Sequence, residues 1–401
     1  MNSCTLKDIT KQIYDGKHGG CTAVDGTGLY FISVKDLEPY SINYENAMQI
    51  SQKEFDEIYN RTNLENGDTI YANTGDTIGK SIYVENNTLT ERTAFQKSVA
   101  VLKPNEKVDS RFLYYLMKYE TPRLRSAASG SGQKNLLLDT MRDFDVEIPD
   151  IPRQEYIAHV LGTIDSIAKN NLSVATTCER ILKEMFSYWF IQFDFPDMNG
   201  KPYKSSGNAM IWNEELHREI PEGWEVKRLG DLILKNTDAI EPDEPTVTMD
   251  LSVMPSNSIC LFTYNTSENF DTNLYVMKKG DLLFGSIRPY LKKAGIAPYD
   301  GTIAGTVHSY RVIKPYYQAY ACATLCNDLT FEYAIKNSKG TKMPVIGSDE
   351  LLDFKVPFCE NIIKQFNDYD FTNIISNCVC QNKSLESLRD ELLPMLMMGE
   401  V

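Results

Sequence analysis

Apolar residues recur in steps of three and four along two stretches of the chain, each about 35 residues long. The first stretch follows Pro152, and the second fills the C-terminal part of the sequence. So narrow a stripe is typical of a helix that packs against one other helix. The predicted seam positions are Ile157, Leu161, Ile164, Asn171, Leu182 and Trp189 in the first helix and Phe371, Ile374, Gln381, Leu385, Leu388 and Leu392 in the second.

Each seam contains one polar residue, Asn171 in the first helix and Gln381 in the second. An unpaired seam would expose an apolar stripe to solvent. We therefore expect the two helices to pair with each other, antiparallel, inside one chain. The alternative is that each helix packs only on its own domain. At roughly 1.5 Å per residue, each helix would be on the order of 50 Å long.

The segments outside these helices contain an internal repeat. Short strand-like runs and the charged turns beside them recur in the same order at a nearly constant spacing, which is the signature of a duplicated structural unit. We therefore predict two copies of one α/β domain, each near 150 residues. The matched segments are 6–9 with 229–232, 67–73 with 280–286, 98–104 with 309–315, and 143–146 with 353–356.

The segment Asn73–Ser81, NTGDTIGKS, nearly matches the phosphate-binding loop G-x-x-x-x-G-K-[ST], but only three residues separate its glycines. A phosphate-binding loop runs into a helix whose N-terminus holds the phosphate. Here strand-like residues stand on both sides, and the equivalent segment of the second copy, 286–294, has neither glycine. We therefore predict a hairpin turn whose tip differs between the copies.

Composition indicates an ordinary globular protein, with 42% hydrophobic and 24% charged residues. No apolar run is long enough for a membrane span, and the N-terminus lacks the apolar core of a signal peptide, so we expect a cytoplasmic protein without a membrane partner. The nine cysteines and four histidines show no metal-ligand spacing, so no metal is expected. The net charge of −14 argues against nucleic acid unless basic residues cluster locally.

Several short motifs stand in a fixed order along the chain, among them Asp15-Gly16-Lys17-His18 and the segment 154–165 at the start of the first predicted helix. They resemble, in that order, the opening and the start of the central helix of the specificity subunits of type I restriction–modification systems. Further similarity lies in 186–190, 212–215, 220–224 and the C-terminal 388–399. The second copy departs from the pattern, because it lacks the D-G-x-H motif and has an acidic start at 236–242.

The resemblance implies an α/β fold: two repeated α/β target recognition domains separated by two long antiparallel coiled-coil helices, with pseudo-two-fold internal symmetry. We place the boundaries at 1–150 for the first target recognition domain, 151–192 for the first spacer helix, 193–222 for a linker, 223–357 for the second domain, and 358–401 for the second spacer helix and tail. Each domain would read one half of a bipartite, asymmetric site in double-stranded DNA, and the helix pair would set the gap.

The same resemblance implies partners. The helices would dock two modification (methyltransferase) subunits, and restriction (translocase) subunits would join the full complex. No cofactor is expected in this chain, whereas S-adenosylmethionine, ATP and Mg are expected on those partner subunits. A spacing of about one DNA turn, roughly 34 Å, between half-sites is compatible with helices of this length.

Basic residues cluster on matching loops of both copies, as DNA contact requires. Lys278–Lys293 contains five cations against one acid, Pro122–Lys134 contains three against none, and Asn337–Met343 is the equivalent loop of the second copy. For any single lysine, a solvated surface charge is the simpler interpretation. The candidate DNA-binding residues are Lys17, His18, Thr77, Lys80, Arg123, Arg125, Gln133, Lys134, Ser286, Arg288, Tyr290, Lys292, Lys293, Lys339, Thr341 and Lys342.

Catalytic signatures are absent from the sequence. There is no Pro-Pro pair for an amino-methyltransferase motif, and the nuclease-like Pro196-Asp197 and Glu225-Val226-Lys227 fall in the linker and at a strand start. We therefore predict a non-catalytic recognition subunit. The alternatives are a stand-alone nucleotide hydrolase or nuclease, and a DNA-mimicking scaffold or anti-restriction protein, which the acidity would suit.

Overall fold

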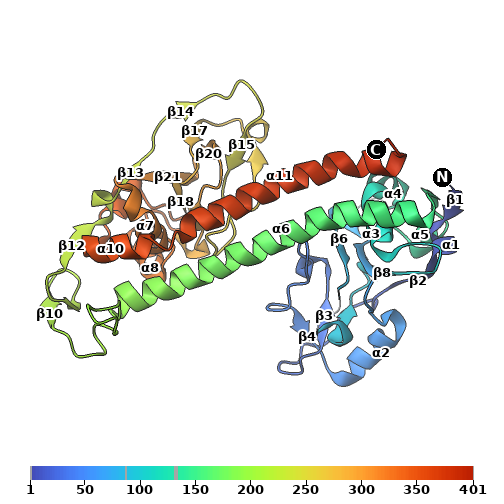
Figure 1. The fold of residues 1–401 in the computed structure, drawn as a ribbon, viewed down its shortest axis with the longest axis horizontal. Coiled ribbons are helices and arrows are strands. Elements are labelled where there is room, and N and C mark those ends of the chain that lie inside the picture. The colour runs from blue at the N-terminus through green and yellow to red at the C-terminus, as the bar shows by residue number, and fades with distance from the viewer. Residues whose placement is uncertain (1, 86–87, 131–133, 401) are drawn as a thin grey trace. The chain divides into compact units, whose positions relative to one another are not determined.

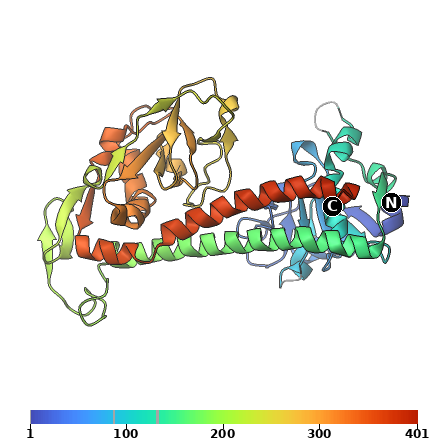
Figure 2. The same cartoon turned by 45° about the horizontal axis from the view of Figure 1, so that its top comes forward.

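The computed structural model of this protein describes residues 2–85, 88–130 and 134–400. Its contacts divide the chain into two compact units (Figures 1 and 2). The first unit contains residues 1–169 and 385–401, and the second contains residues 170–384. Both units are mixtures of helix and sheet, and each includes part of the two long helices α6 and α11.

The first unit begins with a strand that pairs with the end of its own domain, so that the domain closes on itself. Its elements are β1 Asn2–Thr5, α1 Leu6–Ile9, β2 Thr10–Asp15, β3 Tyr30–Ile32, η1 Val34–Asp36, β4 Met48–Gln49, α2 Gln52–Thr62, β5 Thr69–Ala72, η2 Gly75–Thr77, β6 Ser81–Tyr83, η3 Thr90–Arg92, β7 Thr93–Phe95, β8 Val99–Pro104, α3 Ser110–Tyr119, α4 Thr121–Ala127, α5 Leu138–Arg142, β9 Asp145–Ile148 and the first part of α6 Ile151–Phe186.

A four-stranded sheet in the order β2-β8-β5-β6 forms the centre of the first unit. All its pairings are antiparallel, and the interior strand β5 is buried at each of its four residues. A second sheet, β4-β3-β7, contains a parallel pair, and β1 pairs with β9. Asp109 starts α3 by accepting a hydrogen bond from the Phe112 amide (2.8 Å).

The second unit contains the linker and the second copy of the domain. Its elements are the end of α6, η4 Ser187–Ile191, β10 Met210–Asn213, β11 Arg218–Pro221, β12 Glu225–Arg228, η5 Leu229–Asp231, β13 Ile233–Lys235, β14 Ala239–Ile240, β15 Val247–Met249, β16 Asn265–Thr266, η6 Ser267–Asn269, β17 Leu274–Met277, β18 Leu282–Gly285, η7 Pro289–Leu291, β19 Ala294–Ile296, β20 Gly301–Ala304, β21 Val307–Val312, η8 Pro315–Tyr317, α7 Gln318–Leu325, α8 Asp328–Asn337, α9 Ser348–Leu352, β22 Lys355–Phe358, α10 Glu360–Asn367 and most of α11 Phe371–Met398.

The two copies share one topology, so the predicted duplication is confirmed. The sheet β13-β21-β18-β19 has the strand order of β2-β8-β5-β6, and β12 pairs with β22 as β1 pairs with β9. The parallel pair β15–β20 matches β3–β7, although two further strands, β17 and β14, extend that sheet in the second copy. The fold is therefore two repeated α/β domains joined through long helices.

The strand register corrects one of the sequence matches. Gly285 at the end of β18 faces Val307, and Ala72 at the end of β5 faces Val99. The backbone amide of Ser286 donates to Thr306 O (3.0 Å), as that of Asn73 donates to Ser98 O (3.0 Å). Ser98 is therefore equivalent to Thr306, and not to Ser309 as the matching letters suggested. The similar S-x-x-V-[LI]-K-P letters misled because a strand constrains the alternation of buried and exposed positions more than residue identity.

Within each unit, α11 runs antiparallel to α6 (Figures 1 and 2). In the first unit, Ile157 and Leu161 of α6 share a core with Leu393 and Leu396 of α11. In the second unit, Asn171 Nδ2 donates to Gln381 Oε1 (3.2 Å). The two predicted polar seam residues thus contact each other.

The first predicted seam is buried at all six positions, five in α6 and Trp189 in η4, whereas the seam of α11 is shifted. Gln381 is exposed, Leu388 is 45% exposed, and Phe371, Ile374, Leu385 and Leu392 are half-buried. The buried stripe of α11 instead contains Ile375, Val379, Asn382 and Leu393, with Arg389 half-buried on it. Because this buried stripe contains polar residues, the hydrophobic pattern of the sequence did not reveal it. The predicted second helix is also two helices, because Asp370 between α10 and α11 has a φ of 56°.

Aromatic residues at the end of the first long helix and at the start of the linker pack on the second domain. Trp189 and Phe190 lie in the π-helical turn η4 that ends α6, and both rings contact Phe366 of α10, with centroids 5.7 and 5.2 Å apart. Trp224 packs against Phe193 at 5.4 Å. These contacts fix the start of the second copy on the end of α6.

Candidate nucleic-acid interface

The two loops of the first domain that we expected to face DNA lie side by side. We name residues 73–80 the first tip and residues 128–130 and 134–136 the first arm. The Gly75 amide donates to Lys134 O (2.7 Å), and the Leu136 amide donates to Asn73 O (2.8 Å). Because β5 and β6 are antiparallel, the first tip is the hairpin turn that the sequence predicted.

A depression of about 610 Å³ lies beside the first tip. Polar side chains from four loops line it: Ser33, Lys35, Thr74, Thr77, Gln96, Lys97, Ser98 and Asn135. Sequence reasoning missed Lys35 and Lys97. A signal was available for Lys97, because it lies two residues before β8, the strand whose start lies next to the first tip. The shape and polarity suit a sugar–phosphate backbone or a base edge.

The basic candidates of the first copy divide into two groups. Lys80, Lys134 and Arg125 are exposed. The Nε atom of Arg125 also donates to Ile78 O (2.8 Å) in the first tip. Arg123, in contrast, forms an ion pair with Glu120 (2.7 Å) and lies over the Phe144 ring. Thr77 is exposed and donates to Thr74 O (2.6 Å), and Gln133 lies outside the described residues.

The backbone geometry explains why the Asp15-Gly16-Lys17-His18 motif contains a glycine. The Lys17 amide donates to Phe95 O (2.9 Å), and a Cβ added at Gly16 would lie 1.7 Å from that same oxygen. Only glycine permits so close an approach. Asp15 is buried and pairs with Arg61 (2.8 Å), Lys17 lies 3.7 Å from Glu54, and the His18 side chain is exposed.

The second copy builds the same junction from different residues. We name residues 286–293 the second tip and residues 338–346 the second arm. The Arg288 amide donates to Pro344 O (2.7 Å), and the Ile346 amide donates to Ser286 O (2.9 Å). These bonds are the equivalents of those made by Gly75 and Leu136. One frame therefore presents two different sets of side chains.

Several candidates of the second copy have partners inside the chain. Lys292 pairs with Asp328 (2.7 Å), and Lys339 pairs with Glu350 (2.6 Å), a carboxylate that raises the pKa of Lys339. Lys293 Nζ donates to Leu251 O. Ser286 is buried, and its hydroxyl donates inward to Thr306 O (2.8 Å). Arg288, Tyr290, Thr341 and Lys342 are exposed.

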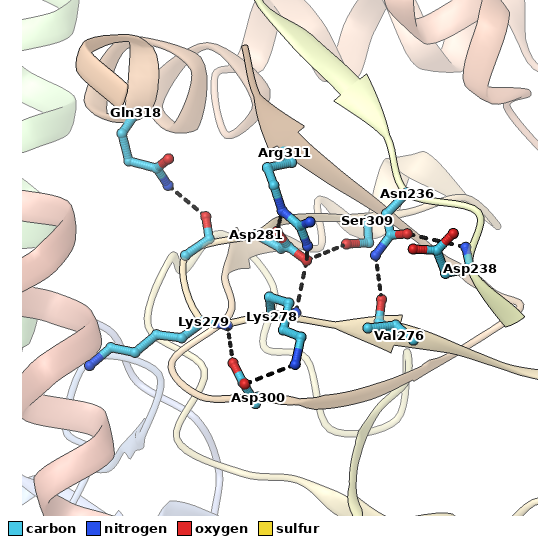
Figure 3. Close-up of polar contacts among 11 residues, drawn as sticks. Asn236, Asp238, Val276, Lys278, Lys279, Asp281, Asp300, Ser309, Arg311 and Gln318 are labelled. Atoms are coloured by element: carbon cyan, nitrogen blue, oxygen red, sulfur yellow. Dashed lines mark hydrogen bonds and ion pairs between the residues drawn. The ribbon is translucent and has the colours of Figure 1, made fainter. Parts of the chain in front are cut away.

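The basic stretch 278–293 is not one cluster. Lys278 and Lys279 lie at the beginning of β18, and the second tip follows its end. Lys278 pairs with Asp300 (3.1 Å), whose other carboxylate oxygen accepts from the Lys279 amide (Figure 3). Beside them Asp281, fully buried, holds Arg311 through two bonds of 2.8 Å (Figure 3). This end of the strand is thus occupied by ion pairs that belong to the fold.

The acidic residues of the second copy gather away from the second tip and second arm. A depression of about 610 Å³ lies between the segments 239–245 and 267–274. Five acids line it: Glu241, Asp243, Glu244, Glu268 and Asp271. Asp250 lies elsewhere and accepts hydrogen bonds from Ser252. The charge is therefore segregated within the second domain.

Comparison with known proteins gives consistent matches. A family model described as the type I restriction modification DNA specificity domain matches residues 25–175. The type I restriction enzyme MjaIX specificity subunit of Methanocaldococcus jannaschii is 26% identical over 341 residues, which cover 80% of this chain and 74% of that protein. A Mycoplasma pneumoniae protein named as a type I specificity subunit is 24% identical over 305 residues, 74% of each chain.

The fold also matches a solved structure. The crystal structure of the type I restriction–modification system S subunit from M. genitalium aligns with a TM-score of 0.57 at 14% identity, over 98% of this chain and 95% of that one. Across the described residues, no helix combines the length and apolar character that a membrane crossing needs.

Proposed function

We propose that this chain, which belongs to the family of type I restriction–modification specificity subunits, reads a bipartite, asymmetric DNA target with one half-site for each copy of its repeated domain. One observation carries the proposal. The tip–arm junction is built twice with the same backbone hydrogen bonds, while its exposed side chains differ between the copies. A shared backbone arrangement that presents different side chains is suited to two domains that recognise different half-sites.

The helices α6 and α11 serve in this proposal as the spacer that sets the gap between half-sites. With 36 residues, α6 is about 54 Å long at roughly 1.5 Å per residue, which is longer than one turn of DNA, roughly 34 Å. A helix is stiff, whereas a flexible linker would leave the gap undefined. The same helices dock two modification subunits, to which restriction subunits are added in the full complex.

We assign the methylation and cleavage reactions to the modification and restriction subunits. S-adenosylmethionine, ATP and Mg bind to the modification and restriction subunits, and this chain has no catalytic centre of its own. The acidic depression between 239–245 and 267–274 meets a basic surface on a modification subunit. Because those subunits supply much of the non-specific attraction to phosphates, the isolated chain binds DNA weakly at physiological salt.

Methylome sequencing tests the proposal. Cells that carry the modification subunit are compared with and without this gene. The expected result is one bipartite methylation motif that is present only with the gene. If every bipartite motif persists without it, the chain is not the sequence reader. ATP turnover by the purified chain that is lost in Lys80→Ala would favour the nucleotide hydrolase instead.

A further inference from the structure

The two tips share a backbone conformation that glycine favours, but only the first tip uses glycine for it. Gly75 and Gly79 have φ values of 67° and 97°. The equivalent residues of the second tip are Arg288 and Lys292, with φ values of 52° and 50°. A long side chain in this left-handed region is strained by about 1–3 kcal/mol. The second copy thus tolerates strain at two positions in order to carry cations.

The strain at Lys292 has an explanation inside the fold. Its ammonium pairs with Asp328 (2.7 Å), at the first residue of α8. Arg288 has no such partner: among residues 2–85, 88–130 and 134–400, none forms an ion pair or hydrogen bond with its guanidinium. It is exposed, and it is the one tip cation of the second copy whose strain the fold itself leaves unexplained.

The backbone of Arg288 is held rigidly although its side chain is free. Its amide donates to Pro344 O (2.7 Å) in the second arm, and its carbonyl accepts from the Leu291 amide (2.8 Å). Pro289 follows it and is buried, which fixes the direction in which the tip leaves β18. A guanidinium on a fixed base is suited to geometric recognition, whereas a lysine acts as a point charge.

We infer that Arg288 reads a guanine in the half-site of the second copy, through bidentate hydrogen bonds to the O6 and N7 atoms at the major-groove edge. Arginine is the residue that most often makes this contact. The inference rests on the proposed function and adds to it the base that one named residue recognises. The first tip has Gly75 at the equivalent position, so its half-site is read by other side chains, among them those that line the depression at Thr77 and Lys97.

The test uses the complete chain together with its modification subunit. Arg288→Gly removes the side chain and restores the residue that the first tip has, Arg288→Gln keeps a polar side chain that is shorter and uncharged, and Lys342→Ala removes an exposed charge from the second arm. Methylome sequencing and DNA affinity are measured for each, with the melting temperature as a check on folding. Arg288→Gly is expected to melt at or above the native temperature, because it relieves the strain.

The expected result is a native motif with guanine at one position of one half-site, where both Arg288 variants lose discrimination by on the order of 5- to 150-fold. The other half-site stays unchanged, and Lys342→Ala weakens binding evenly without changing the motif. If Arg288→Gly also weakens binding evenly, Arg288 contacts phosphate and the inference is wrong. An unchanged motif and affinity would likewise overturn it, while the proposed function would stand. If the native complex yields no bipartite motif, the proposed function fails and the inference with it.

Discussion

Asp165 of α6 and Arg389 of α11 form an ion pair in the first unit, with 3.2 Å between Oδ1 and Nη1. Both side chains are largely buried, at 12% and 14% exposure. Asp165 also accepts a hydrogen bond from Tyr115 OH of α3 (2.8 Å), and the Arg389 guanidinium lies 3.5 Å from Tyr40 OH. One charge pair thus ties the first domain to both long helices.

Breaking this pair from one side should be costly. Arg389→Met leaves the Asp165 carboxylate buried without its cation, and we expect a loss of about 3–5 kcal/mol in the free energy of unfolding. Removing the carboxylate as well is the remedy, because apolar residues in place of both partners leave no buried charge unpaired. Adding Asp165→Ile to Arg389→Met should recover most of the loss. Urea unfolding measures both, and equal losses in the single and double variants would contradict the ion-pair role.

The hydrogen bond between Asn171 and Gln381 should limit stability but define how the helices align. Asn171 is buried in the seam of α6 and Gln381 lies at the exposed edge of α11, and a polar residue in a helical seam specifies register at the expense of stability. We expect the double change to Leu to raise the melting temperature while allowing more than one alignment of α6 and α11. Methylome sequencing would detect the second effect as more than one gap length. A single unchanged gap would show that the domains alone fix the alignment.

Gly16 should be irreplaceable for a packing reason. Gly16→Ala places a Cβ against Phe95 O at 1.7 Å, so the β2–β7 junction must move, at a cost on the order of 1–3 kcal/mol. Gly20→Ala is the matched control, because a Cβ at Gly20 meets nothing within 4 Å. Thermal unfolding of the two variants compares them directly. A smaller loss for Gly16 than for Gly20 would rule out the close approach as the reason for the motif.

Lys118 should make the stability of the first unit depend on pH. Burial, reinforced by repulsion from Arg389, lowers the pKa of its ammonium to about 8, below the value of roughly 10.4 expected in the unfolded chain. The folded state therefore disfavours the proton, and stability rises as the pH rises from about 8 toward 10. Lys118→Met should stabilise the protein at pH 7 by on the order of 2 kcal/mol, and this advantage should shrink near pH 10. The exposed Lys53→Met is the control, and an advantage that stays constant with pH would contradict the assignment.

Local patterns in the sequence predicted the fold well where one physical requirement dominated. The duplication followed from repeated strand and turn letters, and the hairpin at 73–81 followed from strands on both sides of a near-miss motif. The register of α11 did not follow. Its buried stripe contains Asn382 and Arg389, and the partner of Arg389, Asp165, lies more than two hundred residues away in the sequence. A pattern of hydrophobic residues cannot reveal a buried charged residue whose partner is distant in the sequence.

The same limit applies to the candidate interface. The basic loops were predicted to contact DNA, but their contact with each other was not predicted, and the backbone hydrogen bonds join tip to arm in each copy. The sequence could not tell which cations are engaged within the fold. Lys292 and Lys339 have carboxylate partners 36 and 11 residues away in the sequence, and Arg123 pairs with Glu120, which lies just before the acid-free stretch 122–134. Lys35 and Lys97 were missed because each is a single lysine outside any basic cluster.

The measurement that most directly tests the central claim is the methylome of a domain exchange. Residues 1–150 are replaced by the corresponding domain of a homologous specificity subunit with a different motif, and residues 151–401 are left unchanged. We expect the new motif to differ from the native one in one half-site only, with the other half-site and the gap retained. A motif that changes in both halves, or in neither, would contradict the claim that each copy reads its own half-site.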